Sequence, residues 1–182
     1  MQTVKIVIAG PFNAGKTQFI GSISEIEVVS TEQKITDGSQ VVKGETTVAM
    51  DFGRITVDDD LVLYLFGTPG QKRFEFMWDI LAEGMLGFVV LVDSARPETF
   101  REAKMIVDRF RRYSRVPYVI AANKQDIEDA WPPEDLRIAL RAPSGTKVVP
   151  CVATDRQSVK SVLLELLYSV LEKPSEESAG RS

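Results

Sequence analysis

The chain has 182 residues, a formal net charge of −4 and no histidine. This length supports one sizeable hydrophobic core, and an acidic chain lacks the basic footprint of a nucleic-acid-binding protein. We therefore expect one domain over residues 1–173, with no nucleic-acid partner. The Ser- and Glu-rich residues 174–182 are predicted to form a short disordered tail. Without histidine, any acid–base chemistry must use other side chains.

The sequence shows no signal for membrane attachment. Its longest apolar run, residues 85–92, is much shorter than the roughly 20 residues that a membrane helix needs. Neither terminus fits a lipidation pattern. The single cysteine, Cys151, cannot form an internal disulfide, which fits a reducing compartment. We expect a cytoplasmic protein without a direct membrane anchor.

The first predicted elements surround a phosphate-binding loop. Residues 4–9 are apolar and β-branched, which predicts a strand, and residues from 18 onward predict a helix. Between them, residues 10–17 fit the pattern G-x-x-x-x-G-K-S/T in the strand–loop–helix context that it requires. Lys16 is predicted to reach the β- and γ-phosphates, and the Thr17 hydroxyl a bound Mg²⁺. The predicted nucleotide-binding residues here are Gly10, Asn13, Ala14, Gly15, Lys16, Thr17 and Gln18.

The rest of the chain alternates between strand and helix signals. Residues 31–44 are polar without clear periodicity, which predicts a long functional loop. The last helix has one apolar stripe between residues 159 and 170. This alternation indicates an α/β fold with a mixed, mostly parallel six-stranded sheet and helices on both faces. The five further predicted strands are 47–57, 61–66, 86–92, 117–122 and 147–153.

An N-K-x-D pattern formed by Asn123, Lys124 and Asp126 follows the strand predicted over residues 117–122. The Asp126 carboxylate can accept from both the ring N1–H and the exocyclic amine of guanine, whereas adenine has no N1–H. Asn123 would tie this base loop to the phosphate loop, and the Lys124 stem would pack on the purine. Surface loops favour such residues, so the position of the pattern, after a phosphate loop and a core strand, is what favours GTP over ATP.

These motifs resemble those of the Ras-like small GTPases over residues 4–173. Residues 47–52 resemble the end of switch I, residues 67–71 resemble switch II, and residues 151–154 resemble a degenerate guanine loop. Phe12 and the Thr-Pro-Gly-Gln form of switch II look closest to the bacterial conservon-type GTPases, and more distantly to the MglA-like ones. The resemblance implies a P-loop Ras-like G domain that binds GTP or GDP with Mg²⁺. It also implies a roadblock-family partner, as activator or scaffold, at both switches.

The resemblance also implies roles for individual residues. Gln71 would orient the attacking water, with Lys16 as the second catalytic residue. Thr17 and Thr47 would be Mg²⁺ ligands, and the Gly70 N–H would meet the γ-phosphate. The nucleotide-binding residues beyond the phosphate loop would be Thr47, Gly70, Asn123, Lys124, Asp126, Thr154, and Ala153 through an N–H to the guanine O6.

Gly67 is a departure from the family, because Ras-like proteins usually have here the aspartate that helps to hold the Mg²⁺ water shell. Asp51 is a substitute if a tight turn at residues 58–60 pairs it within about a residue of Gly67 on the adjacent strand. A one-residue change of register would point it the other way, and Asp51 would then be an edge-strand acid on a solvated face. The sequence leaves both interpretations open, with Asp51 as a third predicted Mg²⁺ ligand in the first.

Two features predict slow hydrolysis by the protein alone. Phe12 would lie beside the γ-phosphate and crowd out an arginine finger, and no arginine lies between residues 30 and 47 to supply one from switch I. Such a finger is worth about 10³ to 10⁵ in rate, although a partner that repositions Gln71 would still activate. The alternatives are a nearly inactive GTP/GDP-binding switch or scaffold, and a phosphotransferase, against which residues 123–126 argue.

Two side-chain clusters bear on partners. The segment after Gln71 is apolar on more than one helical face, so Phe76 and Ile80 are either exposed for recognition or part of the core. Arginines gather near the end of one helix, where they favour the helix dipole, and a solvated face is the preferred interpretation over a site for an acidic partner. These arginines are Arg109, Arg111, Arg112 and Arg115.

Overall fold

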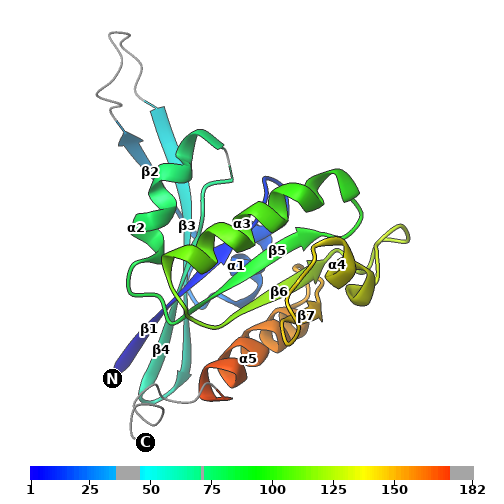
Figure 1. Cartoon of the computed structure of the whole chain (residues 1–182). Coiled ribbons are helices and arrows are strands. Elements are labelled where there is room, and N and C mark those ends of the chain that lie inside the picture. Colours follow the sequence, from blue (N-terminus) through cyan, green and yellow to red (C-terminus); the bar gives the residue numbers. More distant parts are fainter. Residues whose placement is uncertain (36–45, 71, 173–182) are drawn as a thin grey trace, which may run out of the picture.

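The computed structural model describes residues 1–35, 46–70 and 72–172. Over these residues the protein forms one seven-stranded sheet in the order β2-β3-β4-β1-β5-β6-β7 (Figure 1). The strands are β1 Gln2–Ala9, β2 Val29–Ile35, β3 Thr46–Asp58, β4 Leu61–Gly67, β5 Gly87–Asp93, β6 Tyr118–Asn123 and β7 Lys147–Pro150. Gln71 and the predicted tail at residues 174–182 lie outside the described residues.

The pairing of the strands is mixed. β4, β1, β5, β6 and β7 run parallel to one another, whereas β3 runs antiparallel to both β2 and β4. The predicted α/β fold with a mixed, mostly parallel sheet is confirmed, and the sheet has seven strands where six were predicted. Parallel strands of this kind need crossover connections, and helices supply them.

Helices cover both faces of the sheet. α1 and α5 lie on one face, and α2, α3 and α4 lie on the other (Figure 1). The alternation of side chains along β1 explains the two cores, because Ile6 and Ile8 pack with α1 and α5 whereas Val7 and Ala9 pack with α2 and α3. The helices are α1 Lys16–Ile23, α2 Trp78–Ala82, α3 Phe100–Tyr113, α4 Pro133–Ala139 and α5 Arg156–Glu172, with short 3₁₀ turns at Lys72–Met77 and Pro97–Thr99.

The strand β2 corrects one prediction. All six predicted strands are present, but Val29–Ile35 is a further strand where the sequence predicted the beginning of a loop at residue 31. Among the described strands it pairs with β3 alone, and it forms one edge of the sheet. Edge strands tolerate charged side chains, and polar residues such as Glu32 and Lys34 give this segment no apolar periodicity from which a strand could be predicted.

The predicted apolar stripe of the last helix is confirmed for its first four residues. Val159, Val162, Leu163 and Leu166 of α5 are buried, and they pack against the core on the α1 face. No helix among the described residues has the length and apolar character that a transmembrane span requires.

Candidate nucleotide-binding site

The phosphate loop joins the end of β1 to the start of α1, at the edge of the sheet where the parallel strands end. Gly15 precedes the helix with φ 108°, and a Cβ there would lie 2.4 Å from the Asn123 Nδ2. A Cβ on Gly10 would likewise lie 2.6 Å from the Leu91 carbonyl oxygen. Both positions therefore require glycine for packing within the protein, as well as for close approach to a ligand.

Lys16 is folded back onto its own loop. Its side chain is buried, and Nζ donates to the Gly10 carbonyl at 2.6 Å and to the Pro11 carbonyl at 3.0 Å. Burial lowers the pKa of Lys16 to about 8, and the nearby carboxylates of Asp51 and Glu102 only partly oppose this shift. The Lys16 ammonium is thus buried and bonded to two carbonyl oxygens of the phosphate loop.

This shifted pKa predicts that nucleotide binding takes up a proton. Bound phosphate favours the charged form of Lys16 and raises its pKa, so the affinity for GTP should fall as pH rises through 8. We expect about a fourfold loss between pH 7 and pH 8.5. Titration calorimetry at pH 8.5 in two buffers with different heats of ionisation would measure the proton taken up. Phosphate itself titrates near pH 6, so a null result would contradict this role for Lys16.

Asn123 joins the base loop to the phosphate loop, as predicted. Its Nδ2 donates to the Ala14 carbonyl at 2.8 Å, and its Oδ1 accepts from the Ala153 N–H at 2.9 Å. The Ala153 N–H, predicted to donate to the guanine O6, is therefore already bonded to Asn123, and contact with a base would need this bond to be shared or exchanged. Thr154 beside it is exposed.

Lys124 and Asp126 lie at the rim of the site. Lys124 has φ 65°, and its Nζ bonds to the Asp93 carboxylate at 2.7 Å and to the Asn13 carbonyl at 3.3 Å. The Asp126 side chain is exposed. The stem of Lys124 thus spans from the base loop to the phosphate loop, and the Asp126 carboxylate is accessible to a ligand.

Asp93 is a site residue that sequence reasoning missed. It is buried at the end of β5, in register with Asn123 of β6, and it accepts from the Ala95 N–H at 3.0 Å as well as from Lys124. A charged residue directly after an apolar strand, at the carboxyl end of a parallel sheet, is the signal that could have found it.

The register of β3 against β4 places Asp51 opposite Gly67. The Thr17 Oγ1 donates to the Asp51 Oδ2 at 2.5 Å. A Cβ on Gly67 would lie 3.2 Å from the Asp51 Cβ and 3.6 Å from its Oδ2. Of the two registers left open by the sequence, the structure thus has the one that turns Asp51 toward the phosphate loop, into the space that a side chain at position 67 would enter.

Of the remaining predicted residues, the structure brings Gly70 to the phosphate loop but not Thr47. A Cβ on Gly70 would lie 3.0 Å from the Phe12 Cα and 3.1 Å from the Lys16 Nζ. Thr47 lies in β3 and pairs with Lys34 of β2. A strand rises about 3.3 Å per residue, so Thr47 lies about 13 Å along β3 from Asp51. Pairing in the β2–β3 hairpin thus keeps its backbone away from Thr17.

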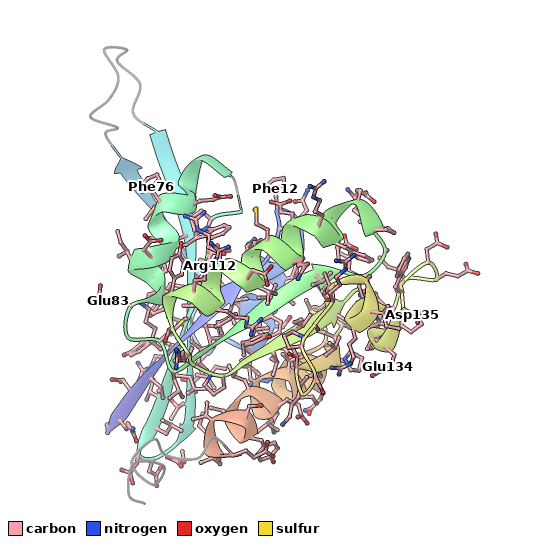
Figure 2. All side chains as sticks on the ribbon, viewed as in Figure 1. Phe12, Phe76, Glu83, Arg112, Glu134 and Asp135 are labelled. Atoms are coloured by element: carbon pink, nitrogen blue, oxygen red, sulfur yellow. The ribbon has the colours of Figure 1, made fainter. Side chains whose placement is uncertain are left out.

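The structure shows which residues of the two predicted surface clusters are exposed. Phe12 of the phosphate loop is 61% exposed, Phe76 is 52% exposed and Ile80 is 63% exposed. Figure 2 labels Phe12 and Phe76. Of the two interpretations of the segment after Gln71, exposure is therefore correct for Phe76 and Ile80. Arg109 corrects the interpretation of the arginines as a solvated face, because it is partly buried in an ion pair with Glu75. Arg111 and Arg112 in the last turn of α3 and Arg115 just after it are exposed.

Comparison with known proteins supports this fold at the level of families. A family model described as "Conserved hypothetical ATP binding protein" matches residues 26–173. An uncharacterized protein of Methanocaldococcus jannaschii is 34% identical over 126 residues, which are 69% of this chain and 73% of that protein. Ras-related protein Rab-3D of Homo sapiens is 27% identical over 94% of this chain and 76% of its own length. ADP-ribosylation factor-related protein 1 of Bos taurus is 28% identical over 74% of this chain and 65% of its own length.

These relatives include Ras-related and ADP-ribosylation-factor-related proteins, and their sequence match extends over most of the chain. The family match covers more than half of the chain, from just before β2 to the end of α5. Together with the phosphate loop and the Ras-like sheet, this shows that the chain belongs to the P-loop family described as conserved hypothetical ATP binding proteins.

Proposed function

We propose that this protein is a guanine-nucleotide-binding switch that hydrolyses GTP slowly to GDP and phosphate. The observation that supports this best is the Asn123 side chain of the base loop, which bonds both to Ala14 of the phosphate loop and to Ala153 in the segment of residues 151–154. The Asp126 carboxylate, three residues beyond Asn123, is exposed and suits the donors of guanine. Lys16 would bind the phosphates, and Lys124 would cover the base.

Mg²⁺ is the cofactor that we propose for this site. Its preferred ligands are oxygens, and the hydroxyl of Thr17 and the carboxylate of Asp51 are 2.5 Å apart beside the phosphate loop. Thr17 would be a direct ligand, and Asp51 would hold the ion or its water shell. When bound, the ion neutralises charge on the β- and γ-phosphates. Thr47 would join only after a rearrangement of the β2–β3 hairpin.

Slow turnover and partner dependence follow from the same geometry. Phe12 projects from the phosphate loop beside Gly70, and an arginine finger, worth about 10³ to 10⁵ in rate, would have to pass it. We propose that a roadblock-family protein of the kind that serves conservon-type and MglA-like GTPases activates or holds this one. The exposed Phe76 and Ile80, close in sequence to Gln71, would contribute to its binding surface.

The buried, unpaired Cys151 suits the cytoplasmic location that we propose.

The second candidate function is a GTP/GDP-binding scaffold with almost no turnover. The position of Thr47 in β3, away from Thr17, favours it. Release of phosphate from GTP in a single turnover, with and without a candidate roadblock-family partner, separates the two. The switch predicts slow release that the partner accelerates. Binding of GTP without release under either condition would identify the scaffold, and rapid release by the protein alone would contradict both.

A further inference from the structure

A tryptophan holds the loop that carries Gly70. Trp78, the first residue of α2, is 2% exposed, and its Nε1 donates to the Pro69 carbonyl at 3.3 Å. Its ring lies 5.6 Å from the ring of Phe110 in α3. The indole therefore connects a loop beside the phosphate site to a helix that packs on the sheet.

Arg109 of α3 fixes this tryptophan from above its ring. The guanidinium carbon lies 5.1 Å from the ring centre, Nη1 bonds to the Glu75 carboxylate at 2.5 Å, and Nε donates to the Tyr113 hydroxyl at 2.6 Å. A cation over an indole is attracted more strongly where water is partly excluded, and this side chain is only 30% exposed. One arginine thus holds both Trp78 and the 3₁₀ turn before it.

The loop of residues 68–70 is fixed at two points. The Thr68 N–H donates to the Ile8 carbonyl at 3.0 Å, and Pro69 accepts from Trp78. Gly70 comes next, close enough to the phosphate loop that a Cβ would lie 3.0 Å from the Phe12 Cα. Because Thr68 and Pro69 are both held, the position of the Gly70 N–H depends on these two hydrogen bonds.

We propose that Trp78 and Arg109 are positioning residues that hold the Gly70 N–H where the γ-phosphate of GTP is bound. This inference rests on the proposed function. GDP has no γ-phosphate, so the two residues favour GTP over GDP and link the choice of nucleotide to α3. Neither side chain touches the nucleotide in this arrangement, and their effect passes through Pro69.

The test uses Trp78→Phe, which keeps a ring against Phe110 and Arg109 but removes the N–H. One net hydrogen bond is worth a factor of about two to ten. We expect the affinity for a slowly hydrolysed GTP analogue to fall about threefold to tenfold, with the affinity for GDP within twofold of wild type. Trp131→Phe is the matched control, because Trp131 packs on Phe100 away from this loop, and it should change neither affinity.

Arg109→Lys is a second variant, which keeps the charge but removes the planar group that stacks and bonds to two partners. It should shift the ratio of the two affinities in the same direction as Trp78→Phe. Equal losses for both nucleotides, or no loss for the analogue in folded variants, would overturn the positioning role. Wild-type protein that binds neither nucleotide would instead overturn the proposed function, so the two failures are distinguishable.

Discussion

Replacing Asp126 with alanine is expected to lower the affinity for GTP and GDP by a factor of about 10² to 10⁴, because two hydrogen bonds to a charged group are lost. The affinity for ATP, which has no N1–H to donate to this carboxylate, should change little. Equilibrium titration with a fluorescent guanine nucleotide, followed by competition with unlabelled GTP and ATP, measures each affinity directly.

The matched control is Asp129→Ala, which removes another exposed carboxylate from the same connection and leaves the N-K-x-D pattern intact. It should bind like wild type. The experiment also tests whether this chain binds ATP, as the family's description says, or guanine nucleotides, as Asp126 within the matched residues predicts. ATP that displaces the labelled nucleotide from wild type as well as GTP does would contradict our assignment of the base.

Removal of the Asp51 carboxylate is expected to raise the Mg²⁺ concentration needed for half-maximal GTP binding by about 10- to 100-fold, the usual cost of losing a group that orients a metal ligand. The reason is its 2.5 Å hydrogen bond with the Thr17 hydroxyl. The variant is Asp51→Ala, and the measurement is GTP binding across a Mg²⁺ titration. Asp59→Ala, in the turn at the other end of the β3–β4 hairpin, is the control for charge.

A swap makes this test sharper. The position of a Cβ on Gly67, 3.6 Å from the Asp51 Oδ2, means that Gly67→Asp in an Asp51→Ala background returns a carboxylate to the same space. The flexible end of Ile20, 3.1 Å from that Cβ, would have to shift slightly. We expect the Mg²⁺ concentration that the double variant needs for half-maximal GTP binding to return most of the way to the wild-type value. An unchanged Mg²⁺ requirement in Asp51→Ala itself would show that Asp51 has no part in metal binding.

The sequence predicted best what short segments encode. The phosphate loop and the N-K-x-D pattern each lie at the end of a strand, so a few residues in order were enough to place Lys16 and Asn123. The sequence also narrowed the position of Asp51 in the β3–β4 hairpin to two registers, because it predicted a tight turn between these strands. The choice between them needed the pairing of Asp51 with Gly67, which depends on the β-bulge between Thr56 and Asp58.

What the sequence did not predict depends on contacts between distant segments. Asp93 matters because β5 and β6 are neighbours, and only the pairing shows that its carboxylate meets Lys124. The hydrogen bond from Ala153 to Asn123 joins residues 30 positions apart. Thr47 was placed by resemblance at the phosphate site, whereas the strand β2, which carries no apolar pattern, pairs with it along the sheet edge.

Glycine at position 15 is commonly explained by the ligand, since a side chain there would keep phosphate away. In this protein the nearest obstacle to a side chain is the Asn123 amide, 2.4 Å from where a Cβ would stand. The same amide donates to the carbonyl of the preceding residue. The glycine would therefore be required even in a protein that never met a nucleotide, and an exchange at this one position would disturb phosphate binding and base recognition together.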